Sequence, residues 1–576
     1  MKKLFALLMA LCLMVGLVPA MAEGDVVSVF YGGGTPKSGD PALNSASSGS
    51  NVIKLSHAGL LGFQWVDGKA EIAPELAESY TISEDQLTWT FTLRKGLKWS
   101  DGSDFKASDI AYSWKRAASP ELGADYSYMY EIIDGYPSNL NITVDDEAGV
   151  FAVKLAAPAP YFKDLAAFPT FYPVKEAVAD NEGIWATKAE TNIGMGPFRM
   201  TAYKVDDVIS FEKNEYYWNA ENVKLAGVNC YLAEDNAAIL AAYENDTAQF
   251  INSNATYPGE LVFHEMQGTY YVLFNVYKDM SPAGKQLSVQ EQSKARFALG
   301  QMVNREELVQ YVTKAGQIPA KGFYPTKLSD GTNPDVRLAE GYTTWYADTA
   351  TISPENEEYT VDQVSAINAL IELGYAHTGT VAEGNIQFTD FPTVEFAFNN
   401  SGANAAIIQY VQETWNKVGI TAVINQEAWA TLQTKLKEGD AEAARMGWVA
   451  DFNDVLNFLE IFISASGNNY PRLGRDIGTY TRASDVSKDA GTGAYWGLEG
   501  NKTWADAYDA LASEVKFTLD PAARVKAAQM AEEVLMATGS VAPLYYYTNP
   551  AMTKPNVEGL IIMPTGDVIW NYVTLK

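Results

Sequence analysis

The chain has 576 residues, which is too long for one hydrophobic core and enough for several domains. Hydrophobic residues make up 47% of it and charged residues 20%, the balance of an ordinary globular protein rather than a disordered one. The formal net charge is −29 and no basic cluster offsets it, which excludes a nucleic-acid-binding surface and a face for anionic lipid.

The first 22 residues have the pattern of a secretory signal peptide. Lys2 and Lys3 precede an apolar run from Leu4 to Val18, and Ala20-Met21-Ala22 is a small-residue cleavage site. The run is short for a membrane span, and no later stretch is long and apolar enough to be one. We therefore expect an exported protein that is cleaved after Ala22 and has no membrane span.

Two cysteines bear on the export route. Cys12 could anchor a lipid, but the bulky Leu11 before it fits a lipoprotein cleavage site poorly, so we expect no anchor. After cleavage only Cys230 remains, which excludes an intrachain disulfide. Its neighbours Val228 and Tyr231 predict a buried strand, in which the thiol packs as a small hydrophobe.

The N-terminal half of the sequence predicts strands, turns and one helix. Val26 to Phe30 is a β-branched strand, and the glycines at 32–34 form a turn because no phosphate-loop motif is completed. Residues 87–93 alternate strictly, which predicts a strand with Trp89, Phe91 and Leu93 facing inward. Ile110 and Trp114 then recur at helical spacing.

The C-terminal half alternates strands and helices. Beyond a long amphipathic helix around residues 295–308, with Arg305 among its polar positions, a helix ends at Gly419 and a strand covers 420–424. A helix over 429–436 and a strand over 443–449 follow. This βαβ rhythm predicts a mostly parallel sheet with ligands bound beyond the carboxyl ends of its strands. Asp451, between Trp448 and Asn453, stands at such an end.

Several segments together resemble one known family. These are the string at 76–116 that runs LAESY to SWKR, Gly196-Pro197-Phe198, and GWVADFNDVLNFL at 447–459. They are similar to the extracellular solute-binding proteins of family 5, which include the oligopeptide-binding proteins of ABC peptide importers. The resemblance spans essentially the whole mature chain. It implies capture of an oligopeptide by hinge closure, delivery to an ABC permease in the membrane, and a protein that is a monomer without a cofactor.

The resemblance also implies a fold: α/β, similar to type II periplasmic-binding proteins, with two lobes of mixed or parallel sheets joined by a hinge and an extra α+β domain. We expect the chain to cross between lobes near Phe274 and near Tyr547. The expected division, after a signal peptide at 1–22, is lobe I at 23–61, 190–273 and 548–576, an extra domain II at 62–189, and a lobe III at 274–547 that carries the main ligand contacts.

The site residues follow from the same resemblance. Asp451 is expected to hold the peptide's α-ammonium group, and tryptophans such as Trp448 and Trp429 to wall side-chain pockets. Arg445 and Lys435 are expected near the peptide's carboxylate. The remaining candidates for ligand contact are Asn404, Tyr126, Asn275 and Tyr547. Two departures bear on the carboxylate end: a lysine stands at 435 where an arginine is usual, and Asn404 replaces a histidine.

Simpler and competing interpretations stay open. Asp451 could cap the helix that begins near Val455, although Asn453 and Asp454 are closer to its start. Within the same fold the ligand could be a dipeptide, an oligosaccharide stacked on aromatic rings, or a nickel chelate, and a secreted peptidase is a further possibility. The three histidines, His57, His264 and His377, are far apart and support neither a metal site nor a catalytic triad.

Overall fold

The computed structural model describes residues 24–31, 34–66, 69–233, 235–252, 261–346, 350–399, 402–474 and 504–576. The predicted signal peptide and the glycines at 32–33 lie outside these ranges. Within them, no helix is long and apolar enough to cross a membrane.

One sheet of eleven strands runs through both halves of the molecule. Its strands follow the order β17-β16-β18-β12-β19-β11-β1-β10-β9-β8, with β13 paired to β19. Their bounds are β1 Val26–Phe30, β8 Phe198–Lys204, β9 Val208–Lys213, β10 Gly227–Tyr231, β11 Phe250–Asn252, β12 Val262–Phe274, β13 Ile318–Pro319, β16 Val394–Asn399, β17 Ala422–Glu427, β18 Ala443–Val449 and β19 Val541–Thr553. The predicted strand at 26–30 is confirmed, and Cys230 is buried in β10 with a free thiol.

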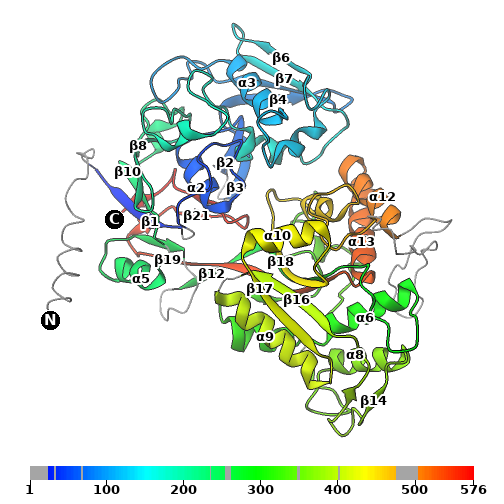
Figure 1. Cartoon of the computed structure of the whole chain (residues 1–576). Coiled ribbons are helices and arrows are strands. Elements are labelled where there is room, and N and C mark those ends of the chain that lie inside the picture. The colour runs from blue at the N-terminus through cyan, green and yellow to red at the C-terminus, as the bar shows by residue number, and fades with distance from the viewer. Residues whose placement is uncertain are drawn as a thin grey trace, which may run out of the picture.

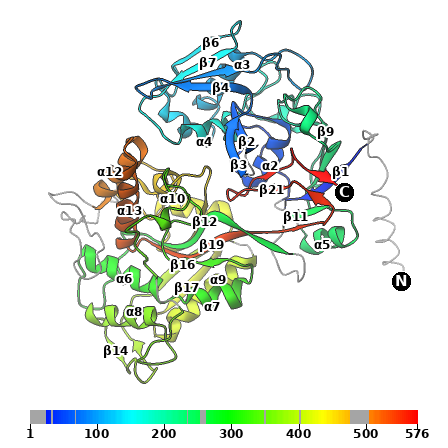
Figure 2. The same cartoon turned by 180° about the vertical axis from the view of Figure 1, so that it is seen from behind.

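The two longest strands, β12 and β19, pair antiparallel and connect the two lobes (Figures 1 and 2). At one end of this ribbon β19 also pairs with β11, and at the other end β12 also pairs with β18. The register shifts between Glu265 and Thr269, opposite the Tyr546–Thr548 stretch of β19, and again between Tyr270 and Tyr271. The ladder is thus irregular beside the predicted crossing at Tyr547. On β12 the residues from Gly268 onward already pair with β18 of the second lobe. The chain therefore enters that lobe before the predicted crossing near Phe274.

A separate four-stranded sheet, in the order β4-β5-β7-β6, forms the core of a smaller domain (Figure 1). Trp89, Phe91 and Leu93 of β5 are buried as predicted, and helix α3 packs on this sheet through Ile110 and Trp114. The bounds are β4 Ala77–Ile82, β5 Thr88–Leu93, β6 Ile142–Asp145, β7 Val150–Lys154, α3 Ala107–Ala118 and α4 Phe162–Ala166. The predicted domain boundaries remain a proposal.

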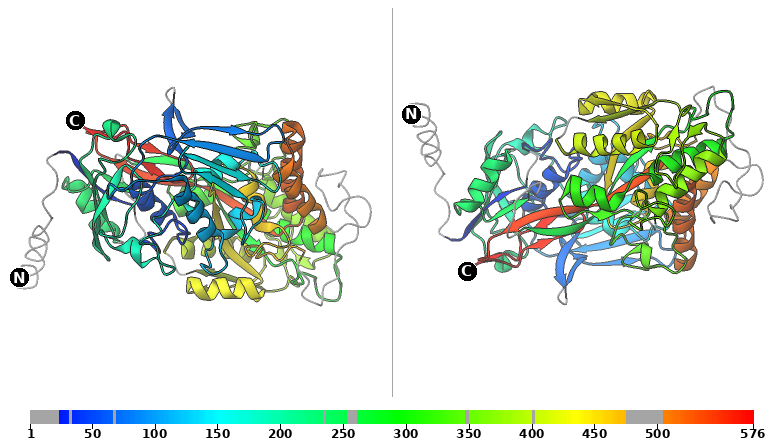
Figure 3. Two further views of the ribbon diagram at one scale, coloured as in Figure 1. Left: turned by 90° about the horizontal axis from the view of Figure 1, so that it is seen from above. Right: turned by 90° about the horizontal axis from the view of Figure 1, so that it is seen from below.

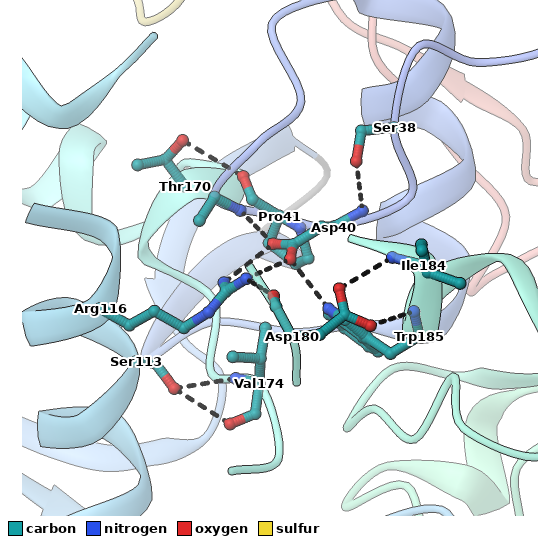
Figure 4. Close-up of polar contacts among 11 residues, drawn as sticks. Ser38, Asp40, Pro41, Ser113, Arg116, Thr170, Val174, Asp180, Ile184 and Trp185 are labelled. Atoms are coloured by element: carbon teal, nitrogen blue, oxygen red, sulfur yellow. Dashed lines mark hydrogen bonds and ion pairs between the residues drawn. The ribbon is translucent and has the colours of Figure 1, made fainter. Parts of the chain in front are cut away.

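A buried cluster ties this smaller domain to the N-terminal lobe (Figure 4). Asp40 accepts two hydrogen bonds from the guanidinium of Arg116 on α3, at 2.7 and 3.2 Å. It also accepts from the indole N–H of Trp185 at 2.9 Å and the amide N–H of Ala42 at 2.9 Å. Every oxygen of this carboxylate therefore has donors, and its charge is balanced by a cation.

The second lobe contains the predicted βαβ units. β16 pairs in parallel with both β17 and β18, and β18 covers the predicted residues 443–449. The strand predicted at 420–424 begins slightly later, at Ala422. The helices of this lobe are α6 Val289–Gln301, α7 Arg305–Glu307, α8 Val361–Glu372, α9 Gly402–Lys417, α10 Trp429–Glu438, α11 Leu456–Leu459, α12 Trp504–Phe517 and α13 Pro521–Ala537. Helices α12 and α13 lie at the end of the molecule opposite to the C-terminus (Figure 3).

The predicted long helix around 295–308 is wrong in two respects. Helix α6 ends at Gln301, and Asn304 caps a new helical turn by accepting from the amide of Glu307 at 3.0 Å. Arg305 is fully buried rather than on a polar face. It donates to the carbonyl of Pro543 at 2.7 Å and stacks on the ring of Tyr346. Helical periodicity alone predicts that this charge is exposed to solvent. In the structure, several backbone acceptors and an aromatic ring satisfy it instead.

The remaining elements are short or peripheral. Helix α2 follows Asp40 and Pro41, and hairpin β2–β3 leads into the smaller domain. The bounds are α2 Ser47–Ser56, α5 Asn236–Glu244, β2 Leu61–Val66, β3 Lys69–Pro74, β14 His377–Thr378, β15 Gln387–Phe388, β20 Val557–Glu558, β21 Ile561–Ile562, β22 Val568–Ile569 and β23 Thr574–Leu575.

Candidate functional site

Asp451 lies just beyond the carboxyl end of β18 and is partly buried. Its Oδ1 accepts a hydrogen bond from the hydroxyl of Tyr126 at 2.6 Å, and its Oδ2 accepts from the amide of Asn457 at 3.1 Å. No lysine, arginine or histidine of the described residues lies within ion-pair distance of it. Burial raises the pKa of Asp451 to about 6, although the hydrogen bonds from Tyr126 and Asn457 lower it.

Asn457 on α11 fixes the orientation of this carboxylate. Its Oδ1 accepts from the backbone N–H of Asp451 at 2.9 Å and from the indole N–H of Trp448 at 3.1 Å. One amide therefore holds both predicted ligand-contact residues of this strand end. We did not predict Asn457, because its role depends on the turn that brings α11 back to β18.

Asp451 is not the cap of α11. Asp454 accepts from the amide N–H of Leu456 at 2.9 Å and forms a buried ion pair with Arg524, with the two atoms 2.7 Å apart. Asn453 accepts from Gln267 and from the amide of Ser329. The structure thus excludes the interpretation of Asp451 as a helix cap.

Two contacts at this point join the smaller domain to the second lobe. Tyr126 precedes a short 3₁₀ segment of the smaller domain, and its hydroxyl reaches Asp451 of the other lobe. Beside it the rings of Tyr161 and Phe452 stack with their centroids 5.8 Å apart. Asp451 is therefore at the interface between the smaller domain and the second lobe.

Arg445, also on β18, is the centre of a second group. Its Nη1 donates to Asn399 at 3.0 Å, its Nη2 to the hydroxyl of Tyr547 at 3.4 Å, and its guanidinium lies 4.8 Å from the ring centre of Tyr270. Its Nε is buried and has no hydrogen-bond partner among the described residues. In the same part of the chain, no carboxylate lies within ion-pair distance of Arg445.

The other predicted residues divide between these groups and more distant places. Asn404 joins the Arg445 group, since its Oδ1 accepts from Tyr270 at 3.1 Å and its Nδ2 donates to Asn399 at 2.9 Å. Lys435 of α10 is engaged in an ion pair with Glu427. Trp429 begins α10 and is 42% exposed, which leaves its ring available to a ligand.

Asn275 is not near either group. It follows β12 at the end where β18 begins, and its amide donates to the carbonyl of Gly439 at 3.0 Å. Its Oδ1 accepts from the amide of Tyr277. Both polar atoms of Asn275 are thus used in holding the chain at the opposite end of β18 from Asp451.

Among the described residues, no group of three or more histidines, cysteines, aspartates or glutamates is arranged to hold a metal ion. His57 is buried, and burial lowers its pKa to about 4. Its Nδ1 is 3.0 Å from the hydroxyl of Ser56.

The sequence matches known solute-binding proteins over most of its length. The model of the family described as bacterial extracellular solute-binding proteins, family 5 Middle, matches residues 71–470. The oligopeptide-binding protein OppA of Bacillus subtilis is 27% identical over 563 residues, covering 94% of this chain and 91% of that protein. The periplasmic oligopeptide-binding protein OppA of Haemophilus influenzae is 26% identical and covers 92% of this chain and 90% of its own length.

Solved structures confirm the fold. The crystal structure of Haemophilus influenzae OppA in complex with RPPGFSPFR matches with a TM-score of 0.70 at 22% identity, covering 96% of this chain and 99% of that one. Listeria monocytogenes OppA bound to peptide also gives 0.70 at 22% identity, with 96% and 100% coverage. The predicted α/β architecture of a type II periplasmic-binding protein is therefore confirmed.

Proposed function

Because the chain belongs to family 5 of the bacterial extracellular solute-binding proteins, we propose that it captures oligopeptides outside the cytoplasm and delivers them to an ABC importer. One observation carries this proposal. Among the residues that the structure describes, Asp451 in the turn after β18 has no cation within ion-pair distance, and Arg445 on that strand has no carboxylate. A ligand with an ammonium group at one end and a carboxylate at the other complements both.

The ammonium end of the ligand belongs at Asp451. A partly buried carboxylate that receives only neutral donors is destabilised relative to one paired with a cation. A peptide's α-ammonium supplies the missing charge together with hydrogen-bond donors. Tyr126 belongs to the smaller domain, so a ligand bound here touches both sides of the interface between that domain and the second lobe and favours the closed form.

The spacing of the two charges suits an extended peptide. Asp451 follows Arg445 by six positions, so their Cα atoms are at most about 20 Å apart along a strand. An extended peptide of about five or six residues has that length. We expect its backbone to add as a strand between the lobes, with side chains in hydrated pockets beside Trp429 and Trp448.

The remaining parts of the proposal concern location and partners. The protein is exported with its leader removed after Ala22, works as a monomer, and passes its ligand to a membrane permease. It performs no chemistry on the peptide. The N-terminal pattern and the periplasmic relative support the export. The monomer, the permease and the absence of chemistry are what the resemblance to the family implies.

Calorimetric titration of free-amine and N-acetylated pentapeptides tests the proposal. Acetylation removes the ammonium, and we expect it to weaken binding at least about 100-fold, the usual effect of losing one partner of a desolvated charge pair. Asp451→Asn is expected to weaken binding of the free-amine peptide to a similar degree and to abolish the dependence on the amine.

Asp440→Asn is the matched control, because it removes the same charge from an exposed position just before β18. It is expected to bind as the unchanged protein does. Equal affinity of the Asp451→Asn variant and the unchanged protein for the free-amine peptide would refute the assignment of the site. Recovery of cleaved peptide would favour the peptidase instead.

A further inference from the structure

The guanidinium of Arg445 is surrounded by polar and aromatic groups that carry no charge. Asn399, the last residue of β16, accepts from Nη1 at 3.0 Å through its Oδ1. The Tyr547 hydroxyl and the Tyr270 ring complete the environment. Arg445 is half-buried, and a guanidinium withdrawn from water is usually paired with a carboxylate, so an amide in this place is unusual.

Asn399 is itself held by a second amide. The same Oδ1 accepts from the Nδ2 of Asn404 at 2.9 Å, which fixes which end of the Asn399 amide faces Arg445. Asn404 is buried and is oriented in turn by the hydroxyl of Tyr270, which donates to it at 3.1 Å. This hydrogen-bonded chain of neutral side chains leaves the Asn399 oxygen one orientation, toward the guanidinium.

The acidic residue that faces Asn399 across the sheet is already engaged elsewhere. Glu427 is the register partner of Asn399 across the β16–β17 ladder. Its carboxylate forms an ion pair with Lys435 on α10 rather than with Arg445. The charges of Lys435 and Glu427 therefore cancel, and Arg445 keeps its full positive charge.

We propose that Asn399 is the positioning residue that restricts this protein to peptides with a free C-terminal carboxylate. It aims the guanidinium by accepting a hydrogen bond without neutralising it. An aspartate of the same shape at this position would pair with Arg445 and remove the attraction for the ligand's carboxylate. The inference rests on the proposed peptide-binding function and deepens it at one end of the ligand.

Pairs of pentapeptides that differ only in a free or amidated C-terminus test the inference at pH 7. In calorimetric titration, we expect the unchanged protein to bind the free acid at least about tenfold more tightly than the amide. The Asn399→Asp variant is expected to lower that ratio to about 1–2 while keeping its preference for a free amine over an N-acetylated one. A merely structural role for Asn399 would weaken both members of each pair equally.

Asn399→Ala is the second variant, because it removes the acceptor without adding charge. We expect it to reduce the acid-to-amide ratio to a few-fold, since the guanidinium is then less well oriented. Asn416→Asp is the matched control, because it adds the same charge at an exposed position about 18 Å along α9 from Asn404. Its ratio is expected to equal that of the unchanged protein.

The outcomes separate this inference from the proposed function. Peptide binding with equal affinity for acid and amide in the unchanged protein would overturn the inference alone. An unchanged ratio in both Asn399→Asp and Asn399→Ala would also overturn it. Failure of the unchanged protein to bind any of the peptides would overturn the proposed function and, with it, this inference.

Discussion

Two carboxylates at domain junctions, Asp40 and Asp451, differ in what balances their charge. Asp40 is fully buried and receives a bidentate arginine, an indole and a backbone amide, as Figure 4 shows. Asp451 receives one hydroxyl and one amide, and no cation of the described residues. The saturated carboxylate holds two domains together permanently. The unsaturated one has no cation among the described residues, which is why we propose that it receives the ammonium group of a ligand.

Breaking the Asp40 cluster is expected to produce the largest effect. Arg116→Ala leaves a buried carboxylate without its cation, so we expect a loss of about 3–5 kcal/mol in the free energy of unfolding. Urea unfolding followed by fluorescence measures it. Lys115→Ala, on the exposed side of the same helix, is the control and should change stability by less than about 0.5 kcal/mol. A loss below about 1 kcal/mol for Arg116→Ala would mean that Asp40 is not held as described.

The pH dependence of peptide binding tests the second carboxylate of this comparison, Asp451. The pKa of Asp451 in the ligand-free protein is about 6, and an ammonium group binds only its ionised form. Affinity should therefore be nearly constant from about pH 7 down to 6.5, since above this range the peptide's α-amino group, with an ordinary pKa of about 7.7–8.0, begins to lose its proton. Below pH 6 it should fall by up to about tenfold per pH unit, because binding must then displace a proton.

Titration of one free-amine pentapeptide at pH 5, 6 and 7 measures this fall. The neighbouring groups that act on Asp451 are Tyr126 and Asn457, which lower its pKa, and Glu460, which raises it. The Asp451→Asn variant should show no fall in this range. A fall of the same size in that variant would assign the pH dependence to another group.

Tyr126→Phe is expected to have the smallest effect. The hydroxyl lowers the pKa of Asp451, so its removal should move the onset of the fall in affinity upward by about one pH unit or less. At pH 8 the affinity should change by less than about tenfold. Tyr128→Phe is the control, since no hydrogen bond joins Tyr128 to Asp451. Equal shifts in both variants would contradict a specific role for Tyr126.

The sequence allowed much of the second lobe to be predicted, because regular alternation of apolar residues determines strands such as β18 and helices such as α10. It also placed Asp451 at a strand's carboxyl end. Asn457 and Asn399 were missed. Each acts through hydrogen bonds to residues on other elements, Asn457 to Trp448 and Asp451 and Asn399 to Arg445 and Asn404, and no periodicity in the sequence reports such contacts.

Arg305 and Asn275 show a second limit of prediction from sequence: both were predicted in the wrong surroundings. A charged residue on a helical pattern predicts exposure, but Arg305 is buried against one backbone acceptor, Pro543, on the distant strand β19 and two nearby carbonyls. Asn275 lies next to a strand of the site in sequence, yet at the wrong end of it in space. Antiparallel pairing of β12 with β18 decides this, and pairing partners are not visible in local sequence.

The irregular β12–β19 ladder has a mechanical consequence. A two-stranded ribbon resists stretching, because its covalent chains and cross-strand hydrogen bonds oppose it, but it twists at small cost. The register shifts between Glu265 and Thr269 and between Tyr270 and Tyr271 interrupt the regular hydrogen bonds at two places along the ribbon. Relative movement of the lobes should thus be a torsion concentrated at those places, with the sliding of one lobe past the other suppressed.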